Sequence, residues 1–209
     1  MGSGAAADLT DEALVMRLGR GDTSAFDALY ARYSQRALGY LRRMLAGDEA
    51  RAQDLLQDLF LTVIDKGHTI DPERQFSRWL FGVAHNLCCS EHRRGQVRRQ
   101  AEAELSRARA AGPAGPDPGS RLDAERFVHR LHGELERLDP ERRSAFLLRY
   151  GDGLAIDDIA AALGCPAGTV KSRLFYTVRL LADRLRPFAP LGDEGEPQPG
   201  AERSHENPE

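Results

Sequence analysis

The stretch GCPAGTVKSRLFY, residues 164–176, decides the fold of the second half of the chain. Apolar residues recur at helical spacing just before it, and Gly164 ends that helix because glycine adopts a left-handed conformation without strain. Pro166 then begins a second helix, since its fixed φ suits the first turn. The stretch therefore predicts a helix-turn-helix, a motif whose second helix enters the major groove of DNA.

The second helix of this motif has an apolar side and a basic side. The apolar stripe, which we expect to face the core, consists of Val170, Leu174, Val178, Leu181 and Leu185. Opposite the stripe lie Ser172, Phe175, Tyr176 and Arg179, flanked by Lys171 and Arg173, and these six are the candidate DNA-binding residues. The aromatic rings suit contacts with bases and thymine methyl groups, and the cations suit phosphates. The alternative is that this side packs against another helix within a larger core.

The composition favours an all-α fold in a reducing, cytoplasmic setting. Helix-forming residues dominate and no alternating strand pattern persists. A formal net charge of −3 argues against indiscriminate binding to polyanions. Cys88 and Cys89 are adjacent and Cys165 is distant, so we expect no disulfide framework. The sequence contains no long apolar run and no signal peptide, so we also expect no membrane insertion.

Breaks in composition divide the chain into two small helical domains. The first covers residues 8–100, with helices expected near 9–21, 24–46, 49–66 and 77–94. Residues 101–121 are rich in Ala, Arg, Gly and Pro and predict a flexible linker. The second domain covers residues 122–187 and ends with the helix-turn-helix. The acidic, proline-rich residues 188–209 predict a disordered tail.

The helix expected over residues 49–66 carries an unusual polar face. Asp54, Gln57, Asp58 and Asp65 share this face with Leu61. A leucine among exposed carboxylates is often accidental. Otherwise it is the apolar centre of an acidic docking surface for a basic partner.

The helix that contains Trp79 has polar groups opposite its expected core side of Leu80, Val83, Ala84 and Leu87. The polar side consists of His85, Asn86, Cys89, His92 and Arg93. His85, Cys89 and His92 share one face at a spacing that zinc ligands could use, with Cys88 beside them. Ordinary polar-face residues explain the same pattern, and we expect neither a metal nor another cofactor.

Two groups of short motifs follow one another along the chain. The first group is QDLLQDLF (residues 53–60), FSRWLF (76–81) and AHNL (84–87). The second is LDPERR (138–143), RYGDGL (149–154), IA (159–160) and GTVKSRL (168–174). Together they resemble the extracytoplasmic-function (ECF) sigma factors of bacterial RNA polymerase, and the likeness covers nearly all of the expected helices.

The resemblance implies a role in transcription initiation without catalysis. The acidic helix would bind the β′ clamp helices of core polymerase, and the second domain would bind the β flap and the promoter −35 element. The loop over residues 67–75 would form a pocket for a flipped-out base of the −10 strand. The side chains that the resemblance assigns to the −10 element are Asp71, Gln75, Arg78, Trp79, Asn86 and Arg93. An anti-sigma factor is a further partner that the resemblance allows.

The sequence departs from the family pattern at several positions. Tyr176 stands where the family usually has an arginine, and Thr177 where it usually has an alanine. Ala155 replaces the usual Ser or Thr cap of the first helix in the helix-turn-helix, so that cap should be weak. A stand-alone helix-turn-helix regulator is the alternative function, but it would need neither the acidic helix nor the Trp79 segment.

Overall fold

The computed structural model describes residues 9–71, 75–106 and 123–188, and every regular element in these ranges is helical. The expected all-α fold is therefore confirmed. Most of the expected linker and nearly all of the expected tail, at residues 107–122 and 189–209, lie outside the described residues.

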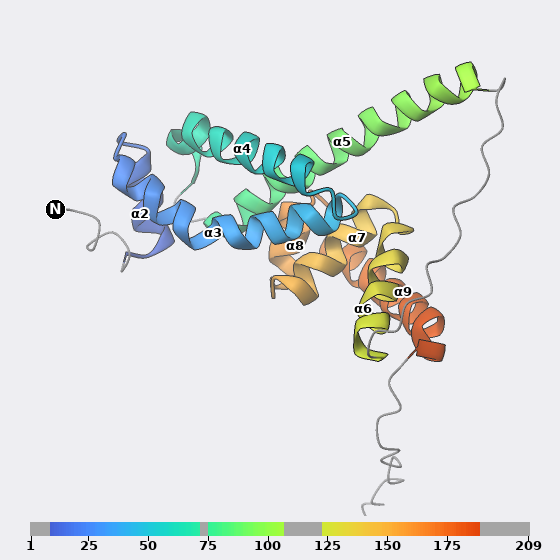
Figure 1. The fold of residues 1–209 in the computed structure, drawn as a ribbon. Coiled ribbons are helices and arrows are strands. Elements are labelled where there is room, and N and C mark those ends of the chain that lie inside the picture. Colours follow the sequence, from blue (N-terminus) through green and yellow to red (C-terminus); the bar gives the residue numbers. More distant parts are fainter. Residues whose placement is uncertain (1–8, 72–74, 107–122, 189–209) are drawn as a thin grey trace, which may run out of the picture.

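Among the described residues, four α-helices form the first half of the fold (Figure 1). They are α2 (Asp11–Leu18), α3 (Thr23–Met44), α4 (Glu49–Lys66) and α5 (Phe76–Ser106), with a 3-10 turn (Gly67–Thr69) after α4. The bounds of α4 agree with those expected from the sequence. By contrast, α5 does not end near Arg94 but continues to Ser106, and Figure 1 shows its final turns projecting from the rest of the fold.

The second half contains α6 (Asp123–Glu136), α7 (Pro140–Phe146), a π-helical turn (Leu147–Gly151), α8 (Ile156–Ala162) and α9 (Ala167–Leu185), followed by a 3-10 turn (Arg186–Phe188). The helices α8 and α9 form the predicted helix-turn-helix. Gly164 lies between them with a φ of 61°, a left-handed conformation that glycine adopts without strain. The predicted reason for the turn is thus confirmed.

Aspartate side chains cap the N-termini of three helices. Asp22, Asp48 and Asp139 each accept a hydrogen bond from a backbone N–H in the first turn of the helix that follows, at 2.9–3.0 Å. Ala155 precedes α8 in the same extended conformation but makes no side-chain cap. The weak cap expected at Ala155 is therefore confirmed.

The core stripe of α9 differs from the expected one at a single position. Thr177 is buried in this stripe, whereas the expected Val178 is 41% exposed. Two successive steps of four residues, from Val170 to Leu174 and on to Val178, place the last side chain about 80° around the helix from the first. A step of three, from Leu174 to Thr177, returns the side chain to the stripe. The Thr177 hydroxyl makes no hydrogen bond to any described group.

The two halves pack directly against each other. In the first half, Tyr33 packs edge-on against Phe76 and Tyr40 against Phe81. Helix α5 then contacts α7 and α8, and α3 contacts α7 and the π-helical turn (Figure 1). The Tyr40 hydroxyl, at the centre of this contact, lies 2.7 Å from the Ser144 hydroxyl, and both residues are fully buried.

We predict that Ala155→Ser stabilises the protein. The backbone at Ala155 already has the extended conformation of an N-cap, so a serine hydroxyl can accept a hydrogen bond from a free N–H of α8. The free energy of unfolding should rise by about 1 kcal/mol, measured by urea denaturation. Ala182→Ser, at an exposed site within α9, is the matched control and should give no increase. Equal unfolding free energies for the Ala155→Ser variant and the wild type would contradict this prediction.

Candidate nucleic-acid and polymerase interfaces

The N-terminal half of α9 presents an exposed aromatic pair beside cations. Phe175 is 61% and Tyr176 59% exposed, and their ring centroids lie 5.4 Å apart in an edge-on arrangement. Lys171 and Arg179 are also exposed, and Arg179 lies opposite the buried stripe whereas Lys171 lies at the edge of the exposed side. Large exposed rings next to cations suit a surface that contacts both bases and phosphates.

Ser172 and Arg173, the other two predicted residues of α9, are partly engaged within the protein. The Ser172 hydroxyl donates a hydrogen bond to the carbonyl oxygen of Gly168 at 3.0 Å, which leaves its lone pairs available as acceptors. The Arg173 guanidinium lies 3.6 Å from the Cys165 sulfur in the turn between α8 and α9, and this residue is only half-exposed. Arg173 is therefore directed toward the turn more than the other cations of α9.

The predicted acidic face of α4 is exposed along its length. Asp54, Gln57, Asp58, Leu61 and Asp65 all face solvent, opposite the buried stripe that begins at Ala52. Leu61 is 62% exposed, so it does not belong to the core. Asp54 accepts a hydrogen bond from Arg51 at 3.2 Å and is the one carboxylate of this set with a described cationic partner.

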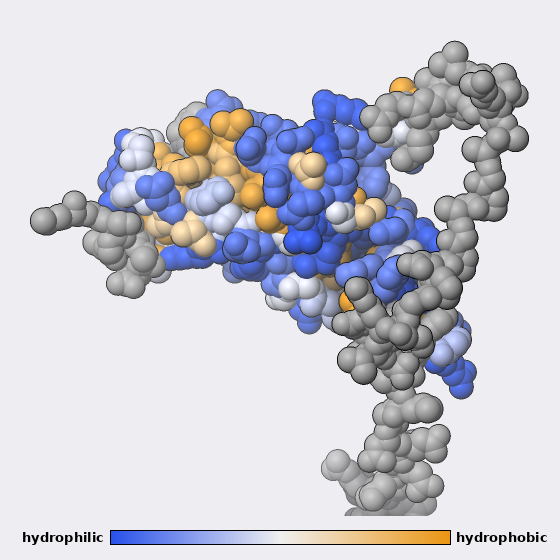
Figure 2. All heavy atoms as spheres, in the orientation of Figure 1, coloured by the Kyte–Doolittle hydropathy of each residue, from blue (hydrophilic) through white to orange (hydrophobic). Residues whose placement is uncertain are grey.

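Exposed apolar residues that were not expected from the sequence lie beside Leu61. Ile64, one turn along α4, is 56% exposed, and Tyr30 of α3 is 44% exposed with its ring centroid 4.7 Å from that of Phe60. Figure 2 shows hydrophobic side chains gathered over the region where Figure 1 places α3 and α4. Ile64 could have been found from its spacing of three residues from Leu61.

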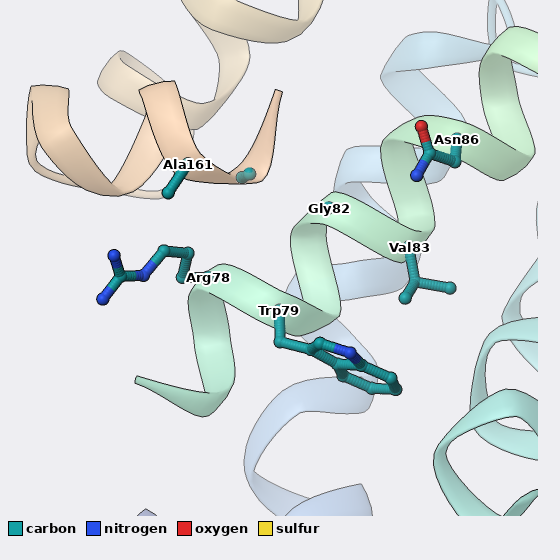
Figure 3. Close-up of a pocket in the computed structure, with 7 residues that line it drawn as sticks. Arg78, Trp79, Gly82, Val83, Asn86 and Ala161 are labelled. Atoms are coloured by element: carbon teal, nitrogen blue, oxygen red, sulfur yellow. The ribbon is translucent and has the colours of Figure 1, made fainter. Parts of the chain in front are cut away.

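The side chains predicted to contact the −10 element separate into two sets. Arg78, Trp79 and Asn86 line one cavity of about 250 Å³, together with Gly82 and Val83 of α5 and with Ala161 and Ala162 of α8. Figure 3 shows Gly82 on the side of α5 that meets α8, with Arg78 reaching below Ala161. The cavity thus lies between the first domain and the first helix of the helix-turn-helix.

Asp71, Gln75 and Arg93 do not line this cavity. All three are exposed, with Asp71 and Gln75 on either side of residues 72–74, which lie outside the described part of the chain. Arg93 lies farther along α5 and donates a hydrogen bond to the Ser90 hydroxyl at 3.2 Å. The six residues therefore extend from the segment before α5 to just past the middle of that helix, without forming one compact cluster.

Comparison with known proteins identifies the family. The sigma-70 region 2 model matches residues 29–99, and the sigma-70 region 4 model matches residues 129–180. The RNA polymerase sigma-H factor of Pseudomonas aeruginosa is 30% identical over 185 residues, which are 85% of this chain and 95% of that protein. The ECF RNA polymerase sigma-E factor of Haemophilus influenzae is 30% identical over 193 residues, 88% of this chain and 99% of that protein.

The chain belongs to the ECF sigma factors. It therefore acts with RNA polymerase in promoter recognition, and a stand-alone regulator would leave the region 2 match unexplained. The fold agrees with two solved structures. CnrH in complex with the cytosolic domain of CnrY gives a TM-score of 0.64 at 24% identity, covering 85% of this chain and 97% of that one. The sigma factor RpoE of Bartonella quintana, in complex with the anti-sigma factor NepR, gives 0.60 at 23%, covering 77% and 96%.

The sigma factor buries part of the side of α5 whose residues are polar. His85 is only 6% exposed, and this burial lowers the pKa of its imidazole. The Glu141 carboxylate opposes that shift, and the Arg173 guanidinium adds a smaller lowering effect. Glu141 and Arg173 belong to the second domain. His85 is therefore covered because that domain packs onto α5.

The candidate metal residues of the sigma factor do not converge. His92 Nε2 lies 3.1 Å from the Met44 carbonyl oxygen, whereas His85 Nε2 lies 3.4 Å from the Cys89 sulfur. Burial raises the pKa of Cys88 to about 12 and also raises that of Cys89, so both thiols stay protonated and weakly nucleophilic at neutral pH. Across the described ranges, no three His, Cys, Asp or Glu side chains could hold a metal ion together. None of the described helices is long and apolar enough to span a membrane.

Proposed function

We propose that this sigma factor binds core RNA polymerase through the acidic face of α4 and reads promoters with α5 and α9. The observation that carries the proposal is the exposed surface of α9, where Phe175, Tyr176 and Arg179 lie opposite the buried stripe and Lys171 lies at the edge of the same surface. Solubility alone does not account for two neighbouring exposed rings on a basic helix. In this proposal the first domain spans residues 8–100 and the second residues 122–187, and the linker between them begins with the last turns of α5, residues 101–106.

Charge and apolar exposure together support the proposed polymerase contact. Asp54, Asp58 and Asp65 form an acidic rim around the exposed Leu61 and Ile64. Such a surface fits a basic partner that also offers apolar side chains, because opposite charges guide association and the buried apolar centre holds the complex. We propose that the β′ clamp helices of core polymerase are this partner. A second contact would form between the β flap of polymerase and the second domain of the sigma factor.

The side chains at the start of α5 support the proposed −10 contact. Arg78 supplies a cation, Trp79 an aromatic surface and Asn86 an amide within one cavity. Cationic grooves with aromatic rings bind single strands, since bases stack on the rings and phosphates meet the cations. Asp71, Gln75 and Arg93 complete the proposed −10 surface on either side of this cavity.

The proposed role is non-catalytic, takes place in the cytoplasm, and includes control by an anti-sigma factor. CnrH and the Bartonella quintana RpoE were solved with the cytosolic domain of CnrY and with the anti-sigma factor NepR. Their likeness in fold supports a similar partner for this chain. The exposed apolar residues of α3 and α4 offer one surface for such a partner.

We predict that the double substitution Asp54→Lys and Asp58→Lys abolishes co-purification with core polymerase, because it reverses the charge of the proposed rim. Both residues are exposed, so circular dichroism should show unchanged helicity. The matched control, Glu136→Lys with Asp183→Lys, makes the same change in charge at exposed sites of the second domain and should bind normally. Undiminished binding by the first variant would exclude the α4 face as the docking surface.

We predict that Tyr176→Arg changes the selected −35 sequence. An arginine at this exposed site can make two hydrogen bonds to guanine, a contact worth roughly 1–3 kcal/mol of discrimination. Selection from a randomised −35 library with wild-type and variant holoenzyme should give motifs that differ at one or two adjacent positions, with guanine gained. Arg186→Ala, beyond the recognition half of α9, should leave the motif unchanged. Identical motifs for the wild type and the Tyr176→Arg variant would show that Tyr176 does not face the groove.

A further inference from the structure

Cations follow one another along the exposed side of α9. Steps of four, four, three and four residues place five exposed side chains within an arc of about 80° around the helix, and these are Lys171, Phe175, Arg179, Ala182 and Arg186. Arg186 keeps a helical backbone just after α9, with φ −46° and ψ −43°. We call Lys171, Arg179 and Arg186 the cation track. It runs for about 22 Å, from the proposed DNA-reading half of α9 to the end of that helix.

The charges of the cation track are not neutralised by the described part of the chain. Two neighbouring arginines are engaged: Arg184 pairs with Glu134 at 2.7 Å, and Arg173 lies against the Cys165 sulfur. None of the described carboxylates forms an ion pair with a cation of the track. Neighbouring like charges without counter-charges raise the local positive potential, so the track is a surface for an anionic partner.

The acidic segment that follows, residues 189–209, supplies the opposite charge. It contains a single arginine, Arg203, against six carboxylates, namely Asp193, Glu194, Glu196, Glu202, Glu206 and Glu209. Its prolines, glycines and scarce apolar residues predict that it forms no packed core of its own. The chain therefore joins a strongly acidic segment directly to the end of a basic helix.

The expected reach of the acidic segment matches the length of the cation track. A disordered chain of this length spans about 25 Å on average, and the track from Arg186 to Lys171 is about 22 Å long. Because the segment starts beside Arg186, its carboxylates remain near the track at an effective concentration on the order of millimolar. Single exposed ion pairs are weak, so the contact depends on this local concentration and on several pairs acting together.

From these charges and lengths, we infer that the acidic segment folds back along α9 and competes with promoter DNA for the cation track. The inference rests on the proposed −35 role of α9. A carboxylate of the segment takes the place of a DNA phosphate on each cation. The segment therefore weakens binding to every DNA sequence by the same factor and leaves the preferred bases unchanged. Salt releases the segment as well as the DNA, so the segment also flattens the salt dependence of DNA binding.

The chain contains two lysines, which make the contact directly measurable. Lys171 belongs to the cation track, and the exposed Lys66 at the end of α4 is an internal control. A water-soluble carbodiimide joins a lysine amine to a carboxylate that touches it, and takes up the water released as the amide forms. At low salt, mass spectrometry of the full chain should find Lys171 joined to the acidic segment several-fold more often than Lys66.

Two conditions show whether this coupling reports the inferred contact. It should fall in 1 M NaCl, where the Debye length is about 3 Å, and on addition of a duplex with the −35 sequence that the wild-type holoenzyme selects. The reaction is run on an equal mixture of chains with natural nitrogen and with nitrogen-15. Coupling within one chain joins peptides of the same label, whereas coupling to a second copy also joins peptides of different labels.

Affinity for the same −35 duplex, labelled with fluorescein, tests the competition. The full-length variant with Asp193→Asn, Glu196→Gln and Glu202→Gln should bind the duplex about twofold more tightly than the wild type, as expected if these groups hold the segment on the track in about half of the chains. A duplex of unrelated sequence should show the same gain. The variant should also show a steeper salt dependence, because less of the segment remains for salt to release.

A matched control removes the same number of charges away from α9. It combines one aspartate and two glutamate substitutions at exposed sites, which are Asp27→Asn, Glu12→Gln and Glu136→Gln. This control should bind both duplexes as the wild type does. An equal gain in affinity for the control and the segment variant would show a general effect of net charge and would overturn the competition.

Three further results would overturn the inference in different ways. Equal coupling of Lys171 and Lys66 to the acidic segment would show that the segment does not lie along α9. Abundant coupling between differently labelled chains would place the segment on a second copy. Failure of the wild type and all variants to bind the −35 duplex, also in complex with core polymerase, would overturn the proposed role of α9 and the competition with it.

Discussion

The buried guanidinium of Arg143 is the contact on which the rest of the structure depends. It donates hydrogen bonds to the carbonyl oxygens of Leu135, Glu136 and Leu138 at the end of α6, and to that of Met44 at the end of α3. The last carbonyl groups of a helix lack partners within the helix, and five N–H donors on one planar group can satisfy several of them. Burial lowers the pKa of Arg143, so these carbonyls offset a real desolvation cost. A single side chain thus closes two helix ends and joins the domains.

The position of the proposed promoter-reading surfaces follows from this junction. Arg143 lies on α7, which packs against α9, so the buried stripe of α9 is fixed and its aromatic side faces outward. The same junction brings the second domain onto α3 and α5, where Tyr40 and His85 become buried. Helix α5 therefore serves two purposes in one chain: its core side holds the first domain together, and its outer side contacts the second domain and carries the side chains that we propose contact promoter DNA.

The sequence predicts most local elements because their signals are local. Asp48 and Gly67 flank α4 and fix its bounds, and Gly164 fixes the turn of the helix-turn-helix. Helix α5 continues to Ser106 because the residues after Arg94 are mostly strong helix formers. The boundary expected near Arg94 did not take this propensity into account. The exposed residues proposed for α4 and α9 follow from helical periodicity in the same way.

Other features depend on contacts between distant segments, so periodicity within one helix cannot reveal them. His85 and Phe81 lie beyond the expected core side of α5, yet both are buried. The second domain covers His85, and Tyr40 packs on Phe81. The cavity at Arg78 and Asn86 likewise needs Ala161 and Ala162, which lie far away in the sequence. The buried stripe of α9 contains Thr177 where the sequence predicts Val178. A threonine is not expected to face apolar neighbours with an unpaired hydroxyl, so the pattern of apolar residues alone does not reveal this position.

Reconstituted transcription tests the central claim most directly, namely that both domains act together to direct polymerase to promoters. Purified core polymerase would be incubated with the full chain and a genomic DNA library, and transcript starts would be mapped by sequencing. The account predicts new starts that core polymerase alone does not make, preceded by two sequence blocks at a fixed separation, one for α5 and one for α9. Starts that match those of core polymerase alone, or starts preceded by only one block, would contradict the account.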